Sequence, residues 1–538
     1  MTDNSDELTG PDLAKGIELS SVNPGDLIAG HAFGEPVLLV HVEPNWFAVG
    51  GKCTHYGATL AEGVLVSETI RCPWHHACFD LRSGAATHAP ALNDLPSYTV
   101  VVENNIVRVA GKRDQSRLHV DDIRPRSSRA PERVLVDENP VVGPSSVFII
   151  GASAAGIACA EMLRREAYRG PITLADMDRD APYDRPNLSK DYLAGNAPEE
   201  WLPLHPGDFF ADQKIGILPG VEALQIDPAS KTVRLNDGSA QHYGALLIAT
   251  GASPIRLVIK GGERIRYLRT LADCRDIIGT LGGARTAVVI GASFIGLEVA
   301  ASLITRGLEV HVVAPETLPL QRVLGTELGE LIKNVHEHRG VRFHLGRTVR
   351  EMGDNAVTLD DGTRLDAALV IAGIGVRPNL KLAEDAGIQL DNGIAVNEFL
   401  ETSARDVFAA GDVARWPDAY SDARLRVEHW VVAERQGQVV ARNMLGHRDR
   451  FDDIPFFWSA HYDNVSIRYT GHAEHWDETR IDGDLTKLDC AVSYMVNGKR
   501  RAIATINRDR QSLETEVEME KELLLKPPPA VTVARSTV

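Results

Sequence analysis

The sequence predicts a multidomain protein with a small antiparallel β domain near the N-terminus, two α/β nucleotide-binding domains and a C-terminal α+β domain. Two Cys-His pairs lie among alternating, strand-like segments before residue 112. Two glycine-rich turns, each between a buried-strand pattern and a helical pattern, begin at Gly151 and Gly291. The chain of 538 residues is long enough for about three or four domains.

The composition and charge of the chain limit which partners, membrane segments and compartments we expect. The net charge is −17, so nucleic acids and anionic membranes are poor partners, whereas a basic patch on another protein is a better one. No run of about 18 apolar residues occurs, and we expect no membrane-spanning helix. The acidic, polar start from Met1 to Asp12 argues against a signal or transit peptide. Six cysteines with no scaffold-like spacing favour a reducing cytoplasm.

The first functional pattern is Cys53-x-His55 followed by Cys72-x2-His75. Two such pairs are typical of a Rieske [2Fe–2S] cluster, in which one iron binds two thiolates and the other binds two imidazoles. A Cys2His2 zinc site is the alternative, but Cys-x-His is an unusual spacing for zinc. We therefore expect these four residues to be cluster ligands.

The residues around the ligands lead to further expectations. His76, beside His75, is expected to face solvent rather than act as a fifth ligand. Cys78 has no cysteine opposite it in the first loop, where Gly57 and Ala58 stand, so no disulfide should join the two loops. The cysteines outside the ligand set are expected to be buried thiols: Cys78, Cys159, Cys274 and Cys490.

Residues 17–111 form the expected β domain. Segments with an alternating, strand-like pattern, such as Pro36–Val42 and Tyr98–Glu103, are separated there by Gly, Asn and Pro turns. Residues 112–145 are rich in Arg, Asp, Ser and Pro and lack sustained periodicity. We expect them to be a linker between the β domain and a larger partner.

Two Rossmann-type fingerprints follow. Val147–Ile150 predicts a buried strand that leads into Gly151–Gly156 and a helix, and Ala287–Ile290 with Gly291–Gly296 repeats the pattern. In both motifs Ser replaces the middle glycine. Such a turn can still present backbone N–H groups and a helix N-terminus to a pyrophosphate. The repeat predicts two nucleotide sites.

The kind of nicotinamide nucleotide depends on the residue after the second strand of each motif, where a carboxylate usually binds the ribose. Asp178 is the candidate after the first motif, and Glu316, two residues late, is the candidate after the second. No Arg stands nearby to hold a 2′-phosphate. The sequence therefore favours NADH over NADPH as the electron donor.

Several other segments carry a family resemblance. They are Pro182–Lys190 (Pro-Tyr-Asp-Arg-Pro-Asn-Leu-Ser-Lys), Ala249–Gly251, Gly373–Pro378 and Phe408–Asp412. With the Cys-His pairs, the chain resembles the Rieske-containing, apoptosis-inducing-factor-like branch of the FAD-dependent ferredoxin reductases. The resemblance runs from about Ile17 to Asn507 and implies a glutathione-reductase-like arrangement of two Rossmann-like domains.

The resemblance implies roles for individual residues. Lys190 should lie beside the flavin and pair with Glu298, because a cation there stabilises negative charge on the reduced ring. Residues expected to contact FAD are Gly151, Ser153, Ala154, Ala155, Gly156, Asp178, Arg185, Lys190, Ala223, Thr250, Gly251, Arg269, Gly411, Asp412 and Trp430. Residues expected to contact NAD are Gly291, Ser293, Phe294, Ile295, Gly296, Glu316 and Gly375.

Three aromatic residues have two interpretations each. Phe294 covers the nicotinamide site before NADH enters, or it is a core residue. Trp430 and Trp458 form the rim of the flavin site facing the cluster domain, or they are simple packing residues.

The expected domain boundaries follow from these patterns. The FAD-binding domain comprises residues 146–265 and 386–450, and the NAD(P)-binding domain comprises residues 266–385. Residues 451–525 form a C-terminal domain that packs over the flavin, and the Pro-rich tail from 526 to 538 is expected to be disordered.

Together these features predict a flavoprotein that carries electrons from NADH through FAD to its own Rieske cluster, because a flavin can exchange either one or two electrons. The final acceptor is unknown, and a Rieske oxygenase or another redox protein fits. The main alternative is a redox-sensing protein with slow turnover. The sequence lacks the redox-active cysteine pair that a disulfide reductase needs. It also lacks the iron site of two His and one carboxylate that an oxygenase needs. The chain is expected to be a monomer or homodimer.

Overall fold

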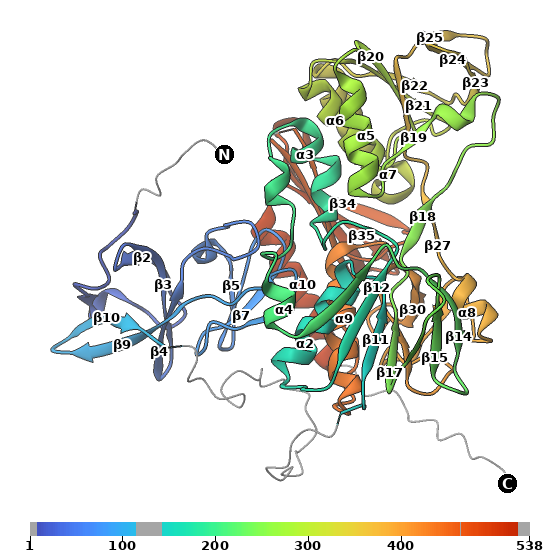
Figure 1. Ribbon diagram of the computed structural model, residues 1–538. Coiled ribbons are helices and arrows are strands. Elements are labelled where there is room, and N and C mark those ends of the chain that lie inside the picture. Colours follow the sequence, from blue (N-terminus) through green and yellow to red (C-terminus); the bar gives the residue numbers. More distant parts are fainter. Residues whose placement is uncertain (1–7, 115–142, 463, 526–538) are drawn as a thin grey trace.

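The computed structural model describes residues 8–114, 143–462 and 464–525 (Figure 1). Most of the expected linker and the whole expected tail lie outside the described residues. The multidomain architecture predicted from the sequence is confirmed, with an N-terminal β domain, two parallel-sheet units and a C-terminal α+β unit.

The N-terminal β domain contains two antiparallel sheets. The larger sheet has the order β1-β10-β9-β4-β3-β2, with β1 (Ile17–Glu18), β2 (Leu27–Ala32), β3 (Glu35–Val42), β4 (Asn45–Gly50), β9 (Ser97–Glu103) and β10 (Ile106–Lys112). The smaller sheet comprises β5 (Val64–Val66), β6 (Thr69–Arg71), β7 (Cys78–Asp80) and β8 (Ala86–His88). The smaller sheet lies on the side that faces the rest of the chain (Figure 1).

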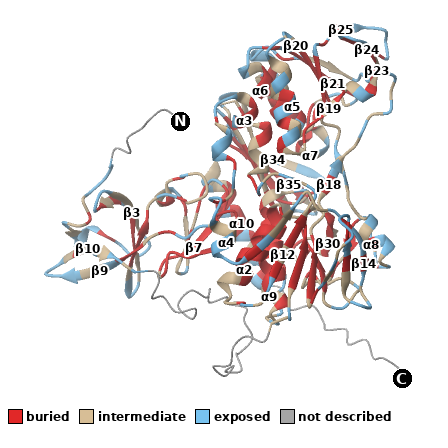
Figure 2. Cartoon of the chain, viewed as in Figure 1, coloured by how far each residue is buried: buried red, intermediate tan, exposed pale blue. Residues whose placement is uncertain are grey.

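The first nucleotide-binding unit is built on a five-stranded parallel sheet with the order β13-β12-β11-β17-β29. Its strands are β11 (Val147–Ile150), β12 (Ile172–Asp176), β13 (Ile215–Pro219), β17 (Ala245–Ile248) and β29 (Val407–Ala409). Helices α2 (Ala154–Arg165) and α9 (Trp430–Met444) pack against each other beside it. All residues of β11 and β17 are buried, as expected for a parallel sheet covered on both faces (Figure 2).

Smaller elements complete this unit. They are α3 (Asp191–Ala194), α4 (Phe209–Asp212), α8 (Lys381–Asp385), β14 (Ala223–Asp227), β15 (Thr232–Leu235), β16 (Ala240–His242), β28 (Ile394–Ala395), β30 (Ala414–Pro417) and β31 (Arg424–Leu425).

The second nucleotide-binding unit repeats the design with the order β19-β26-β20-β21-β22, again parallel. Its strands are β19 (Arg266–Tyr267), β20 (Thr286–Ile290), β21 (Glu309–Ala314), β22 (Arg342–Leu345) and β26 (Leu369–Ala372). The accompanying elements are α5 (Leu271–Leu281), α6 (Phe294–Thr305), α7 (Gln321–His338), β23 (Val349–Met352), β24 (Ala356–Leu359) and β25 (Arg364–Asp366).

Two paired strands connect these units. The chain leaves the first unit through β18 (Ala252–Pro254) and returns through β27 (Val376–Pro378), and the two strands are antiparallel. In Figure 1 they form the crossing between the lower and the upper part of the molecule. The inserted second unit is thus joined to the first by a short two-stranded link, and it also packs on the first unit through α3 and α6.

The C-terminal unit consists of an antiparallel sheet and one long helix. The sheet has the order β32-β33-β36-β35-β34, with β32 (Phe456–His461), β33 (Val465–Gly471), β34 (Glu478–Asp484), β35 (Asp489–Val496) and β36 (Lys499–Ile506). Helix α10 (Asp509–Leu525) packs on β33 and β36 and also contacts β5 of the N-terminal β domain. None of the helices in the described ranges is long and apolar enough to cross a membrane.

Candidate functional site

The four expected cluster ligands gather at the tips of two neighbouring loops. Cys53 and Cys72 are buried and their side chains are in contact. The Nδ1 atoms of His55 and His75 face each other at 3.0 Å. Burial lowers the pKa of His55 to about 3, so its imidazole is neutral, which is the state that binds a metal.

The backbones of the two loops are alike. Cys53 N–H donates to Ala58 O at 2.9 Å, and Cys72 N–H donates to Ala77 O at 2.8 Å. Each loop thereby closes on itself and presents one sulfur and one imidazole nitrogen to the other loop. The first loop joins β4 to β5, and the second joins β6 to β7.

This donor set fits a binuclear cluster. Two sulfurs form one pair and two imidazole nitrogens form another, as a [2Fe–2S] centre with two thiolates on one iron and two imidazoles on the other requires. A zinc ion needs four donors around one point. The pairing of sulfur with sulfur and of nitrogen with nitrogen favours the two-iron cluster over a single zinc ion.

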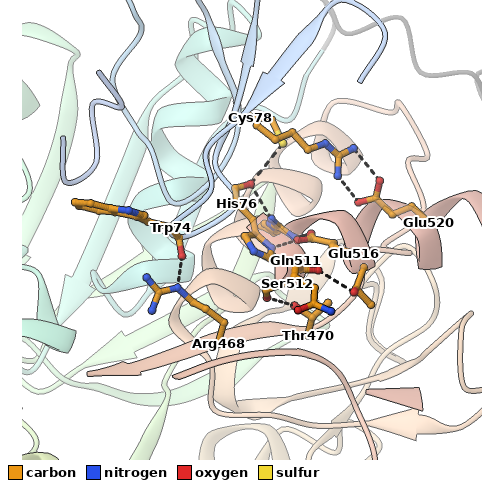
Figure 3. A network of polar contacts seen from close by, with 12 residues as sticks. Trp74, His76, Cys78, Arg468, Thr470, Gln511, Ser512, Glu516 and Glu520 are labelled. Atoms are coloured by element: carbon orange, nitrogen blue, oxygen red, sulfur yellow. Dashed lines mark hydrogen bonds and ion pairs between the residues drawn. The ribbon is translucent and has the colours of Figure 1, made fainter. Parts of the chain in front are cut away.

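The expectation that His76 faces solvent is wrong. The residue is fully buried, and its Nδ1 contacts the carboxylate of Glu516 on α10. Its positive φ of 62° turns the chain, and helix α10, far away in the sequence, covers the side chain. Figure 3 shows His76 facing Glu516 beneath the second ligand loop.

The contact with Glu516 belongs to a buried ionic network that joins three units. Arg435 of α9 donates to Glu516 Oε1 at 2.8 Å and to the backbone oxygen of His76 at 3.1 Å. Burial disfavours the Glu516 carboxylate, but Arg435 and His76 outweigh this effect and hold its pKa below the usual range. Arg71 of β6 donates two hydrogen bonds of 2.8 Å to Glu520, one turn further along α10 (Figure 3).

Further contacts hold the ligand loops against the first nucleotide-binding unit and the C-terminal sheet. Tyr56, which stacks on His55, donates a hydrogen bond to Asp184. Arg468 of β33 donates to the backbone oxygen of Trp74 at 2.7 Å (Figure 3). Because these partners come from several elements, the β domain has a defined docked position.

Trp458 on β32 lies between the cluster ligands and the large central cavity. Its ring centroid is 4.4 Å from that of His75 and 6.2 Å from that of His55. Trp458 also lines the cavity. One side chain therefore touches both sites.

The cavity has a volume of about 1080 Å³ and lies where the two nucleotide-binding units and the C-terminal sheet meet. Most of the expected nucleotide-contacting residues line it: Ser153, Ala154, Ala155, Arg185, Lys190, Gly251, Ser293, Phe294, Ile295, Arg269, Gly375, Gly411, Asp412 and Trp430. Its size suits a large cofactor together with part of a second ligand.

Other expected residues do not line the cavity: Gly151, Gly156, Asp178, Ala223, Thr250, Gly291, Gly296 and Glu316. Asp178 accepts a hydrogen bond of 2.8 Å from Tyr183, and Thr250 donates one of 2.9 Å to the backbone oxygen of Asn379. Asp176, not Asp178, accepts the Ala152 N–H of the glycine-rich turn. The nucleotide-binding roles expected for the eight residues outside the cavity wall remain predictions.

Both glycine-rich turns use the same steric device. Gly151 has a φ of 109°, and a Cβ atom there would lie 2.2 Å from the backbone oxygen of Ala249. Gly291 has a φ of 104°, and its Cβ would lie 2.4 Å from the backbone oxygen of Gly373. Only glycine allows the neighbouring strand to approach this closely.

Lys190 and Glu298 form the expected ion pair at the cavity wall. Lys190 Nζ lies 2.9 Å from Glu298 Oε2, and the Glu298 side chain is almost completely buried. Ser189 and Ser459 also donate to this carboxylate. Glu298 lies near the start of α6, the helix that follows the second glycine-rich turn, and it is held there by a cation and two hydroxyls.

The cationic wall of the cavity has spare hydrogen-bonding capacity. The buried Nε of Arg185 has no hydrogen-bond partner among the described residues. Arg269 forms an ion pair of 2.9 Å with Asp412. An unpaired buried donor costs free energy unless a ligand satisfies it, so this wall fits a cofactor with acceptor atoms, as FAD has.

The cysteines outside the ligand set are buried thiols, as expected from the sequence. All six are buried and free, and no described cysteine lines the cavity. A dithiol mechanism at the flavin therefore has no candidate in the described residues.

Reasoning from the sequence missed residues that surround the site. Glu516, Arg435 and Glu520 dock the cluster domain, while Ser459, His461 and His336 extend the Glu298 hydrogen bonds. No local motif marks them. The only signal was the alternating pattern of 456–461, which places Ser459 and His461 on one face of a strand.

Comparison with protein families gives two matches. Residues 15–99 match the Rieske [2Fe-2S] domain, and residues 145–437 match the pyridine nucleotide-disulphide oxidoreductase family. The second match covers most of the two nucleotide-binding units, but not the part of the cavity wall that the C-terminal sheet supplies.

Individual proteins resemble most of the chain. Apoptosis-inducing factor 3 of Mus musculus is 35% identical over 88% of this chain and 78% of its own length. The anthranilate 1,2-dioxygenase system ferredoxin–NAD(+) reductase component of Burkholderia cepacia is 37% identical over 66% of this chain and 89% of its own. A crystal structure of the covalent putidaredoxin reductase–putidaredoxin complex superposes with a TM-score of 0.68 at 35% identity, over 70% of this chain and 93% of that one.

The geometry and the comparisons agree on a flavin site, a nicotinamide site and an iron–sulfur site in one polypeptide. The chain belongs to the pyridine nucleotide-disulphide oxidoreductase family, as an FAD-dependent oxidoreductase with its own N-terminal Rieske [2Fe–2S] domain.

Proposed function

We propose that this enzyme oxidises NADH and passes the electrons through FAD to its own Rieske cluster, and from there to an external one-electron acceptor. One observation carries this proposal: Trp458 lines the cavity and also contacts His75, so the flavin site and the cluster site share a wall. A Rieske oxygenase or another redox protein fits as the final acceptor.

The chemistry of the two groups requires them to work together. When bound, the flavin takes two electrons as a hydride and gives them up singly, and the cluster accepts one at a time. Lys190 supplies a positive charge at the cavity wall, and Glu298 keeps that charge in place. The neutral imidazoles of His55 and His75 would raise the potential of the cluster relative to an all-cysteine one.

The docked position of the β domain supports transfer within one chain. Glu516 is completely buried between His76 and Arg435, and Arg71 holds Glu520 with two hydrogen bonds. Opening this interface would leave several charges without partners, which is costly in a buried site. The ligand loops therefore stay beside Trp458 during turnover.

The donor is expected to be NADH. Glu316 lies in the loop after β21, where a carboxylate suits a free ribose hydroxyl and repels a phosphate. The Burkholderia cepacia relative is named an NAD(+) reductase component of a dioxygenase system, which supports both the donor and the kind of acceptor. A reducing compartment such as the cytoplasm suits the free thiols.

Anaerobic reduction by NADH tests the proposal. The flavin absorbance should bleach first, and the EPR signal of a reduced Rieske cluster should then grow at a rate that supports turnover. If the flavin is reduced while the cluster stays oxidised for minutes, the proposal is wrong. A long-lived complex of reduced flavin and NAD⁺ would instead favour a redox sensor.

A further inference from the structure

The docked position of the β domain covers most of the two ligand loops. In the second loop every residue from Cys72 to Ala77 is buried except Trp74, which is 36% exposed. In the first loop the residues from 54 to 56 are half-buried, and Tyr56 stacks on His55. Trp74 therefore has the most exposed side chain of the two loops.

The ligand His75 contacts two tryptophans. Its ring centroid lies 4.4 Å from that of Trp458 and 6.5 Å from that of Trp74, whose ring meets it at 75°. Trp458 lines the cavity, whereas Trp74 does not and is open to solvent instead. One ligand ring is thus linked by an aromatic contact to the cavity and by another to the surface.

Trp74 has a fixed position although its ring is exposed. Arg468 Nε donates to the backbone oxygen of Trp74 at 2.7 Å, and Arg468 is itself buried and paired with Asp509 at the start of α10. Figure 3 shows the Trp74 indole pointing away from the contact between His76 and Glu516. The backbone is clamped on the inner side, and the ring faces outward.

The proposed function requires a place where electrons leave the protein. Oxidation follows NADH → NAD⁺ + H⁺ + 2 e⁻, so two acceptor molecules are each reduced by one electron. Trp458 covers His75 on the cavity side, and Tyr56, which is bonded to Asp184, covers His55. An acceptor therefore has to reach the docked loops at a side chain that solvent also reaches. This requirement rests on the proposed function.

We propose that Trp74 is the electron exit, and that the acceptor protein docks with its redox group over the Trp74 indole. Each transfer removes one electron from the protein and adds one electron to the acceptor, and no bond is made or broken. Tryptophan is also among the side chains that most often dominate the energy of a protein interface. Trp74 thus serves both as a contact residue and as the last aromatic ring on the route.

The partner that fits is a one-electron carrier protein with a basic contact surface. The charges next to the loops are mixed, with Lys52 before the first loop and Asp191 close enough to act on Tyr56. The attraction therefore comes from the chain as a whole, whose net charge is −17. Such a field steers a basic protein toward the surface and a second acidic protein away from it.

Cytochrome c, a basic one-electron carrier, is the probe for the first test. Protein reduced with dithionite is mixed anaerobically with oxidised cytochrome c, and the second-order rate constant of cytochrome reduction is measured. Trp74→Ala should lower this constant at least about tenfold, because truncating a central interface tryptophan commonly has such an effect. Reduction of the cluster by NADH should keep its rate, since Trp458 is unchanged.

Trp46→Ala is the matched control. Trp46 lies in the same domain at the other end of β4 from the first ligand loop, where its ring stacks on His41. This variant should react with cytochrome c at the wild-type rate. Trp74→Phe keeps an aromatic ring and should lose less than Trp74→Ala. Cys72→Ser, which lacks a cluster ligand, gives the rate of any direct reaction of the flavin, and this rate is subtracted.

A second readout depends neither on electron transfer nor on the folding of a variant. Hydroxyl-radical footprinting of the oxidised wild-type protein, with excess cytochrome c at low ionic strength where charges are little screened, reports which side chains the partner covers. Oxidation of Trp74 should fall, and oxidation of Trp46 should not change. A Trp74 that is oxidised equally with and without cytochrome c would overturn the exit site.

The outcomes separate the exit from the proposed function. If NADH reduces the cluster but Trp74→Ala passes electrons to cytochrome c at the wild-type rate, the exit is wrong and the proposed function stands. If NADH never reduces the cluster, the proposed function is wrong, and the dithionite-reduced protein still decides whether Trp74 is the exit. A reduced wild-type cluster that does not react with cytochrome c would overturn the assignment of a basic partner.

Discussion

At the scale of single residues, Trp458 is where the two redox sites meet. Its ring contacts that of His75, and it forms part of the cavity wall beside the Lys190–Glu298 pair. An aromatic ring between the cluster ligands and the cavity shortens the gap that an electron has to cross.

We expect Trp458→Leu to slow electron transfer to the cluster without slowing hydride transfer from NADH. The rate of cluster reduction should fall about tenfold, equivalent to about 1.4 kcal/mol in the barrier. Stopped-flow absorbance at flavin and cluster wavelengths measures both steps. Trp458→Phe keeps an aromatic ring, so its rate of cluster reduction should fall less. An unchanged rate in Trp458→Leu would show that electrons take another route.

The cluster ligands can be tested by metal content. Cys72→Ser removes one of the two paired thiolates, so we expect loss of the iron and the acid-labile sulfide while bound FAD is retained. Metal and sulfide analysis of the purified protein measures this. Stoichiometric zinc without sulfide in the wild-type protein would contradict the cluster assignment.

Burial of His461 makes a prediction about acid stability. The pKa of His461 is lowered from 6.5 to about 3 in the folded protein. Between these values the unfolded state binds the proton and the folded state does not, so the contribution is complete above pH 6.5 and is lost as pH falls. The loss is about 1.4 kcal/mol for each pH unit below that point.

We therefore expect His461→Gln to make the acid side of the stability curve less steep by about one proton. Urea unfolding free energies of the variant and wild type, measured from about pH 5 to 7, provide the comparison. Equal slopes would mean that His461 is protonated in the folded protein.

Residues within local motifs could be predicted, and residues that depend on distant packing could not. The four ligand positions and the Lys190–Glu298 pairing follow from short patterns and a family resemblance, and the structure brings these residues together. His76 looked exposed because nothing near it in the sequence shows that α10 covers it. His336 and His461 lie far apart in the chain, so only the folded structure reveals their contact.

At the scale of elements, helix α10 docks the β domain against the rest of the chain. It follows the last strand of the C-terminal sheet, and it places Glu516 and Glu520 against His76 and Arg71 (Figure 3). The helical spacing of four residues aligns both carboxylates on one face.

Glu516→Gln should weaken this docking strongly, because it leaves Arg435 without its buried counter-charge. Breaking a buried pair costs about 3–5 kcal/mol. Glu514→Gln on the exposed face of α10 is the control, and its pair with Arg510 should contribute no more than about 1 kcal/mol. Denaturant unfolding followed by cluster absorbance measures both, and equal stability of the two variants would rule out the docking role.

The core of each nucleotide-binding unit was predictable because one buried strand, β11 or β20, leads into a glycine-rich turn and a helix. The docking was not, because Arg435 and Glu516 lie on helices whose contacts depend on tertiary packing. The described residues begin again only at 143, so most of the expected linker from 112 to 145 stays a prediction.

At the scale of the whole molecule, the chain combines a reductase and its electron carrier. In proteins whose carrier is separate, transfer waits for two molecules to meet, and a flexible tether alone raises the local concentration only to about the millimolar range. Here the buried network and the shared Trp458 wall fix the carrier beside the cavity.

The measurement that tests this arrangement most directly is the rate of cluster reduction after mixing with excess NADH, recorded at several protein concentrations. Transfer inside a docked chain predicts a single rate that is independent of protein concentration and of added viscogen. A rate that rises in proportion to protein concentration would mean that electrons pass between molecules. A rate that falls with viscosity would mean that the β domain has to move first, and either result would contradict the docked arrangement.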